Sequence, residues 1–273
     1  MTIPQPCWRA GACRRCCSRD PSTDGTPPVT GEDDIPRRIP RPRDMTLADI
    51  PPELGLFPLR EALLLPQGKL PLNVFEPRYV ALVEDALAGT RLIGMIQPRH
   101  DERDEDEDGE GGRDDGMDGP FPALYRIGCV GRITSMTERS DGTYAVTLTG
   151  LARFRLLRES GLHRGYRRAR IDVSSFASDL TEAEATFYDR ERMMQALRRY
   201  CRSRGIGARW SMIEQMDDEA LLVTLPMICP FLAAEKQALL ESGTLADRAR
   251  TLQTLLDLAG HEPDEGASRP PLS

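Results

Sequence analysis

The pattern of hydrophobic and polar positions divides the chain into four stretches. Residues 1–48 are rich in Pro, Arg, Asp and Gly and show no apolar periodicity, which predicts a disordered extension. Residues 49–178 show mostly the alternation typical of β-strands, whereas residues 179–262 show the spacing of amphipathic helices. Residues 263–273 are predicted to be a disordered tail. Strands followed by helices predict an α+β protein in two halves.

The strand half contains a clear hairpin. Residues 140–143 (Ser-Asp-Gly-Thr) predict its turn, because Asp-Gly tolerates the positive φ that such turns require. Apolar positions alternate on both sides of it, at Tyr125, Ile127, Cys129 and Ile133, at Tyr144, Val146 and Leu148, and at Phe154 and Leu156. One segment departs from this pattern, because Pro77 favours a helix start and helical spacing follows as far as Gly89.

The helical half has its own start and stop signals. Thr181-x-x-Glu184 and Ser211-x-x-Glu214 match the capping box, and the second of these helices is predicted to stop at Pro226. Pro230 predicts the start of the next helix, which ends near Gly243. A last helix is predicted by apolar residues three and four positions apart: Leu245, Ala249, Leu252, Leu256 and Ala259.

Charge is distributed unevenly. The chain carries −7 overall, but residues 101–119 alone hold eleven acidic residues and two arginines, so the rest of the chain is close to neutral. Asp104-x-Asp106-x-Asp108-Gly109 matches the opening of a calcium loop, with Asp115 at the closing position. Pro98 and Pro120 flank the segment where helices should be, so we interpret it as a solvated loop without a defined calcium site.

Cysteine spacing gives a second metal hypothesis. Cys13-x-x-Cys16, with Cys7 and Cys17 nearby, is half of a zinc-ribbon spacing, and no second pair follows at a suitable distance. We therefore expect no metal and no cofactor. Three further cysteines lie within apolar patterns and are predicted to be small core residues: Cys129, Cys201 and Cys229.

Residues that support catalysis are poorly placed. None of the three histidines, at positions 100, 163 and 261, lies on an element that would hold a general base rigidly. Gly68-Lys69 mimics the end of a phosphate loop, but Leu70 stands where a Ser or Thr should ligate magnesium. The other lysine, Lys236, is predicted to be solvated in the middle of a helix. We expect a protein that is not an enzyme.

Two arginine clusters suggest a different function. Residues 164–170 and 198–204 each contain four arginines that could meet phosphates. No aromatic residues alternate with them to form a stacking platform, and the second cluster shares its segment with several acids. RNA binding is therefore the alternative hypothesis, and nucleic acid is the less favoured partner.

The sequence also predicts the location of the protein. No stretch approaches the roughly 20 apolar residues of a membrane span. The first residues lack the apolar core of a secretory signal, and Pro4 and Pro6 spoil the amphipathic helix of a transit peptide. We expect a cytoplasmic protein that does not bind membranes.

The order of several short motifs resembles a known family. The motifs are Leu56-Phe57-Pro58-Leu59, Leu65-Pro66, Leu72-Asn73-Val74-Phe75-Glu76-Pro77-Arg78-Tyr79, Gly128, and Thr149-Gly150-Leu151-x-Arg153-Phe154. Together with the helical second half, they resemble the amino-terminal substrate-binding domain of Lon proteases over residues 50–260. The chain looks like the short, stand-alone bacterial members, which lack the ATPase and protease domains.

The resemblance implies a fold and roles for the motif residues. The fold would be a PUA-like pseudo-barrel of about six strands with one tucked helix, followed by a helical bundle. The motif residues would be mostly structural: Pro58 and Pro66 would shape turns, and Glu76 and Arg78 would fasten the helix start to the barrel. Gly150 would permit a tight turn between strands, and Arg153 would bond across it.

The resemblance also implies a function. We expect a non-catalytic polypeptide-binding or adaptor module that binds unfolded or exposed polypeptide segments through apolar surface at the barrel–bundle junction or the barrel rim. A separate protease is the second partner considered. A remnant peptidase is the third hypothesis, after RNA binding. The acidic insert at 101–119 would lie between two strands, where a loop lengthens at low entropic cost.

Overall fold

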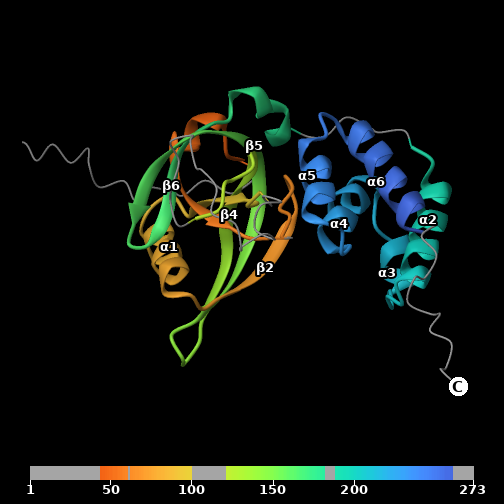
Figure 1. Cartoon of the computed structure of the whole chain (residues 1–273), viewed down its shortest axis with the longest axis horizontal. Helices are drawn as coiled ribbons and strands as arrows, with labels where there is room; N and C mark the ends of the chain where they lie inside the picture. The colour runs from red at the N-terminus through yellow and green to blue at the C-terminus, as the bar shows by residue number, and fades with distance from the viewer. Residues whose placement is uncertain (1–43, 61, 100–120, 182–187, 261–273) are drawn as a thin grey trace, which may run out of the picture. The chain divides into compact units, whose positions relative to one another are not determined.

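The computed structural model describes residues 44–60, 62–99, 121–181 and 188–260 (Figure 1). The strands are β1 (Glu53–Pro58), β2 (Lys69–Val74), β3 (Leu92–Ile96), β4 (Ile127–Glu138), β5 (Tyr144–His163) and β6 (Tyr166–Asp172). The helices are α1 (Pro77–Ala88), α2 (Arg190–Ser203), α3 (Trp210–Glu214), α4 (Asp218–Ile228), α5 (Ala233–Glu241) and α6 (Leu245–Ala259), with 3₁₀-helices η2 (Leu47–Asp49) and η4 (Ser174–Leu180). The predicted α+β class is confirmed.

The strands form one mixed sheet in the order β2-β5-β4-β3-β1-β6. Only the β1–β3 pair is parallel. β6 also pairs with β5, so β5, β4, β3, β1 and β6 form a closed ring of hydrogen-bonded neighbours. β5 makes this possible because its first part pairs with β2 and its last part with β6. Within the described residues β2 pairs with β5 alone, which leaves its outer edge free.

Apolar side chains fill the inside of the closed sheet. Leu56 and Phe154 are completely buried together on this face, and Ile93 is completely buried on the opposite face of the sheet, so every residue of β3 is buried. Gly128 is required on β4 because a Cβ atom would lie 2.4 Å from Cζ of Phe154. The alternation of apolar positions in the sequence thus follows from the two faces of each strand, one of which points into the closed sheet.

The hairpin between β4 and β5 is confirmed. Arg139 N donates to Thr143 O at 2.9 Å, and Gly142 has a φ of +79°. The helix predicted at Pro77 is also confirmed, since α1 begins at that residue and ends before Gly89. Its buried face packs against β1, β3 and β6.

The helical second half differs from the prediction in its helix boundaries. The helix predicted from Ser211 to Leu225 is two helices, because Asp217 caps a new start by accepting from Ala220 N at 2.7 Å. Pro226 does not stop α4, which continues to Ile228, since a proline this close to the end removes little helical hydrogen bonding.

The other helices are close to the expected places. α2 begins at Arg190 behind the cap Asp189, and the Glu184 end of the predicted capping box lies outside the described residues. α5 begins at Ala233 rather than Pro230, because Glu235 closes the helix start by accepting from Leu232 N. The last helix, α6, is confirmed from Leu245 to Ala259.

The predicted extension overlaps the folded part at its end. Met45 is buried, and Arg132 Nη1 contacts its Sδ at 3.2 Å, so the predicted boundary at residue 48 is several residues too late. An apolar side chain among prolines and arginines gave no periodic signal. Residues 1–43 with Cys7, Cys13, Cys16 and Cys17, the acidic tract at 101–119 and the tail at 263–273 lie outside the described residues.

Candidate functional site

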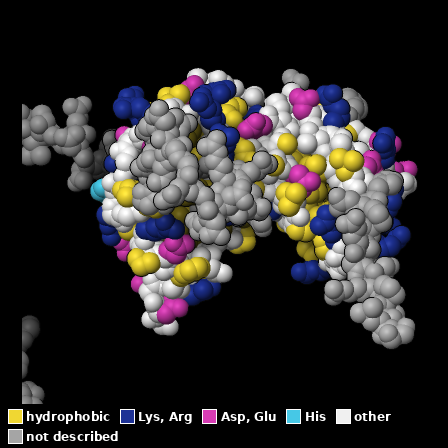
Figure 2. Space-filling model, viewed as in Figure 1, with side chains coloured by type: hydrophobic (Ala, Val, Ile, Leu, Met, Phe, Trp, Pro, Cys, Tyr) yellow, Lys and Arg dark blue, Asp and Glu magenta, His cyan; other side chains and the backbone are white. Residues whose placement is uncertain are grey.

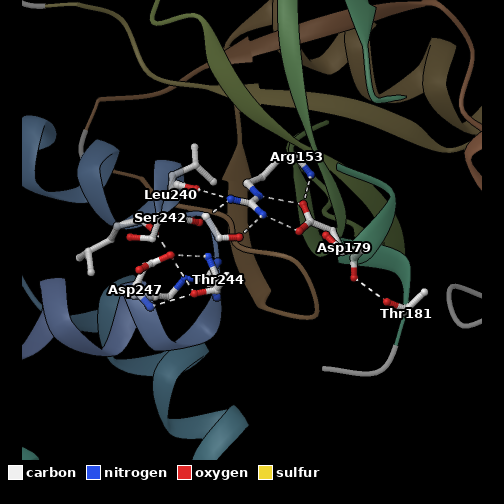
Figure 3. A network of polar contacts seen from close by, with 11 residues as sticks. Arg153, Asp179, Thr181, Leu240, Ser242, Thr244 and Asp247 are labelled. Atoms are coloured by element: carbon white, nitrogen blue, oxygen red, sulfur yellow. Dashed lines mark hydrogen bonds and ion pairs between the residues drawn. The ribbon is translucent and has the colours of Figure 1, made fainter. Parts of the chain in front are cut away.

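A buried ion pair joins the sheet to the helical half. Arg153 on β5 donates through Nε and Nη2 to the two carboxylate oxygens of Asp179 in η4, at 2.8 and 2.7 Å (Figure 3). The backbone N–H of Arg153 also donates to Asp179, at 2.8 Å. Both side chains are less than one-tenth exposed. In a bidentate ion pair of this kind, the two hydrogen bonds fix the orientation of the guanidinium plane, and the carboxylate neutralises its positive charge.

The same guanidinium holds the end of α5. Nη1 of Arg153 donates to the carbonyl oxygen of Ser242 at 2.5 Å, directly after the last residue of α5 (Figure 3). A positive group at a helix C-terminus pairs with orphan carbonyls and with the negative end of the helix dipole. Arg153 therefore positions α5 against the sheet. This role differs from the expected bond across a turn.

A second set of hydrogen bonds fixes the middle of α5. Gln237 Nε2 donates to the carbonyl oxygen of Ile127 on β4 at 3.1 Å, and Gln97 Nε2 donates to Gln237 Oε1 at 3.2 Å. Both glutamines are buried. Lys236 is buried in α5 as well, so the prediction that it is solvated is wrong. Its neighbours in sequence are polar, but its side of the helix faces the core.

A groove of about 410 Å³ lies beside this junction. We call it the junction groove. One wall is the turn that leads into β2, with Gln67, Gly68 and Lys69, and the other is α4, with Val223, Thr224, Met227 and Ile228 among its residues. Ile228 is 62% exposed, and Figure 2 shows apolar side chains at the surface over α4.

Gly150 and Pro66 shape the turn whose residues Gln67 and Gly68 line the junction groove. Pro66 lies in a turn that Gly68 N closes by donating to Leu65 O at 2.9 Å. Gly150 lies inside β5 and not in a turn, so its expected role is wrong. A Cβ atom there would lie 2.0 Å from Leu65 O, and only glycine lets the turn lie against β5.

The free edge of β2 begins at the junction groove. Lys69 is both the first residue of β2 and part of the groove lining. Pro71, in the middle of the strand, lacks a backbone N–H and limits unspecific strand pairing along this edge. A groove with an apolar patch, here Val223, Met227 and Ile228, beside a free strand edge is a combination that can take up an extended peptide.

Three of the remaining family motif residues, Pro58, Arg78 and Tyr79, line another pocket, which we call the rim pocket. It has a volume of about 180 Å³ and is lined by Pro58, Arg60, Arg78, Tyr79, Pro98, Phe121, Pro122, Gly165, Tyr166 and Arg167. These residues come from the end of β1, the start of α1, the chain before β4 and the β5–β6 turn.

The motif side chains at the start of α1 mostly contact one another. Arg78 donates to Glu76 at 2.6 Å, so these two residues pair with each other. Their expected role of fastening the helix start to the barrel stays a prediction. Tyr79 stacks on Phe57 with a centroid separation of 4.3 Å. Phe75, by contrast, is 69% exposed. Burial raises the pKa of Tyr79.

A third hollow, of about 340 Å³, contains a histidine beside an acid. His163 Nε2 lies 3.5 Å from Asp85 Oδ2 of α1, and the Tyr166 hydroxyl donates to the same carboxylate at 2.8 Å. Burial and this bond raise the pKa of Tyr166 to about 12. The group ties the β5–β6 turn to α1.

Most arginines of the two clusters have acidic partners. The pairs are Arg164 with Glu84 and Asp85, Arg167 with Glu159, Arg168 with Glu53, Arg198 with Glu214, and Arg199 with Asp257. These pairs neutralise the positive field that phosphate binding needs.

Other candidate chemistry is absent from the part of the chain that the structure describes. Cys129, Cys201 and Cys229 are buried, as predicted, and burial raises the pKa of each thiol. No cluster of metal-ligating side chains occurs among the described residues. No described helix has the length and apolarity needed to cross a bilayer.

Sequence reasoning missed both the partner of Arg153 and the junction groove. Asp179 follows Arg153 by 26 positions and carries no motif signal. Ile228 follows Pro226, which we interpreted as the end of a helix. The exposure of Ile228 depends on how α4 packs against the rest of the protein, and no local sequence pattern indicates that packing.

Comparison with known proteins identifies one family. The model of the ATP-dependent protease La (LON) substrate-binding domain matches residues 53–257. Lon protease 2 of Myxococcus xanthus is 33% identical over 153 residues, which are 55% of this chain and 17% of that protein. Lon protease 2 of Sorangium cellulosum is 36% identical over 118 residues, 43% of this chain and 13% of that protein. The chain thus spans less than a fifth of these relatives.

A solved structure is also similar. The Lon N-terminal domain protein from Xanthomonas campestris is 24% identical, with a TM-score of 0.44, over 75% of this chain and 96% of that one.

Proposed function

This chain belongs to the family of the ATP-dependent protease La (LON) substrate-binding domain, and on that premise we propose that it is a non-catalytic module that binds exposed polypeptide segments. Its closed sheet would be the PUA-like pseudo-barrel of the family and its second half the helical bundle. It would act as an adaptor that presents bound segments to a separate protease.

The observation that carries this proposal is the junction groove beside the free edge of β2. Ile228 and Met227 give the groove an apolar wall, and β2 offers unpaired backbone groups next to it. A polypeptide lying in the groove would bury Ile228 and hydrogen-bond to the strand edge. Such binding recognises exposed apolar side chains and unpaired backbone groups, and unfolded segments offer both.

A non-catalytic role agrees with the chemistry of the described residues. The thiols of the three described cysteines are buried, and Lys236 is enclosed in the core. Lys69 lies at the junction groove, where its aliphatic stem can cover apolar surface and its ammonium group can remain in water.

The test is binding of a fluorescein-labelled, reduced and alkylated polypeptide, followed by fluorescence anisotropy. Ile228→Ser should weaken binding about tenfold, as loss of most of one buried aliphatic side chain predicts. The matched control is Leu258→Ser on α6, because Leu258 is 64% exposed and lies outside the groove lining. Equal affinities for the wild type and both variants would contradict the proposal.

The RNA alternative makes the opposite prediction for salt. Phosphate contacts make the logarithm of the affinity fall steeply with the logarithm of the salt concentration, whereas capture by an apolar groove does not. The same titration with a single-stranded RNA separates the two hypotheses.

A further inference from the structure

We propose that the rim pocket binds one carboxylate group of the polypeptide partner, an inference that rests on the proposed function and adds a substrate preference to it. The ligand is a peptide carboxylate, from an acidic side chain or from the chain terminus. The junction groove, which shares no lining residue with the rim pocket, would hold the apolar part.

The charge balance of the rim pocket supports a single negative ligand. Three arginines line it: Arg60, Arg78 and Arg167. Arg78 is paired with Glu76, and Arg167 with Glu159, so two of the three positive charges are compensated. Arg60 is exposed and has no side-chain partner among the described residues. Among the described residues, one positive charge of the rim pocket is therefore not compensated by an acidic side chain.

The two paired arginines are held in place before any ligand arrives. Arg167 is buried, also donates to the carbonyl oxygen of Pro122 at 2.8 Å, and lies 5.8 Å from the centroid of the Phe121 ring. Arg78 lies 4.6 Å from the centroid of the Tyr79 ring. A fixed guanidinium loses little conformational freedom when it donates a further hydrogen bond to a ligand oxygen.

The size and walls of the pocket favour a peptide group over a nucleotide. A volume of about 180 Å³ is well below the roughly 300–1,000 Å³ of sites that enclose a drug-sized ligand. Pro58, Pro98 and Pro122 form rigid apolar walls beside the arginines. One carboxylate with its short aliphatic stem suits this space, because the stem meets proline rings and the oxygens meet guanidinium groups.

The experiment compares short fluorescein-labelled peptides that have the same apolar centre. The first pair contains a single Glu or a Gln in its place, both with amidated ends, and the second pair has no acidic side chain and ends in a free or an amidated carboxyl group. Affinity is measured for the full chain and for Arg60→Gln. The control is Arg209→Gln, because Arg209 is an exposed arginine of the helical half and its side chain makes no hydrogen bond or ion pair with another described residue.

The proposal predicts that the wild type prefers the carboxylate member of at least one pair about tenfold. Arg60→Gln should remove most of this preference, and Arg209→Gln should retain it. Preference within the first pair identifies an acidic side chain as the ligand, and preference within the second identifies the chain terminus. Both results support the proposal.

Three results would overturn it. Equal binding of all four peptides that still depends on Ile228 would leave the proposed function intact and remove only the carboxylate preference. No binding of any peptide would remove both proposals. Binding of a short oligouridylate that is lost in Arg60→Gln would assign the pocket to phosphate instead.

Discussion

Arg153 and Asp179 form a buried two-pronged ion pair whose guanidinium also binds the carbonyl oxygen that follows α5. One side chain on a strand thereby positions the C-terminal end of α5 against the sheet. The cation of Arg153 lies 5.0 Å from the centroid of Phe176, which covers the pair from one side. Arg153 is thus a family motif residue that links three elements: β5, η4 and the end of α5.

Arg153→Gln should therefore lower the free energy of unfolding by about 3–5 kcal/mol, because Asp179 would stay buried without its direct ion-pair partner. Urea unfolding, followed by circular dichroism, measures this change. Arg250→Gln is the matched control: its pair with Asp247 is exposed at 2.6 Å, and its loss should cost less than about 1 kcal/mol. Similar losses in both variants would show that the buried pair is unimportant.

Replacing both partners tests the reason for that loss. Arg153→Met combined with Asp179→Leu removes both buried charges, so it should cost less than Arg153→Gln alone. A larger loss in the double variant would mean that the hydrogen bonds to α5, rather than the uncompensated acid, dominate.

Asp85 should make the free energy of unfolding depend on pH in the acidic range. Burial acts to raise the pKa of Asp85, but hydrogen bonds from Tyr166 and Arg164 outweigh it and lower the pKa from its ordinary value of 3.8. The bonds of the ionised form thus stabilise the fold above pH 3.8 and are lost as the pH falls through the lower folded value. Thermal unfolding of Asp85→Asn should therefore vary less with pH, below about pH 4, than that of the wild type. Parallel profiles would contradict this.

The acidic tract at 101–119 should act on binding through its charge. Its eleven acidic residues and two arginines act on the whole charge of a polypeptide, in addition to the single carboxylate proposed for the rim pocket: they repel strongly acidic polypeptides and attract basic ones. Deleting it should strengthen the binding of an acidic unfolded polypeptide and weaken that of a basic one at low salt, with smaller changes at physiological salt. Anisotropy titrations at both salt concentrations measure the effect. Unchanged affinities at low salt would show that the tract does not influence partner choice.

Local signals in the sequence predicted the elements whose causes are local. Pro77 and Gly89 bracket α1, the Asp-Gly turn forms the β4–β5 hairpin, and regular apolar spacing gives α6. The failures have longer-range causes. Pro226 was interpreted as a stop although the helix ends two residues later, and Lys236 was expected in water although α5 turns it inward.

The place of the candidate site was expected only in outline, and this expectation stays a prediction. The family resemblance implied apolar surface at the barrel–bundle junction or at the barrel rim, and the junction groove lies at the first of these places. The lining residues could not be found from the sequence, because Gly68 and Met227 are distant in the chain and meet only when α4 packs against the turn before β2. Periodicity describes one element at a time and contains no information about such contacts.

Hydrogen exchange with and without an unfolded polypeptide tests the central claim most directly. If the junction groove and the edge of β2 bind the polypeptide, new amide protection should appear in residues 67–74 and 223–228, and it should disappear in Ile228→Ser. Protection in residues 164–170 and 198–204, with none at the junction groove, would contradict the account and favour binding through the arginine clusters.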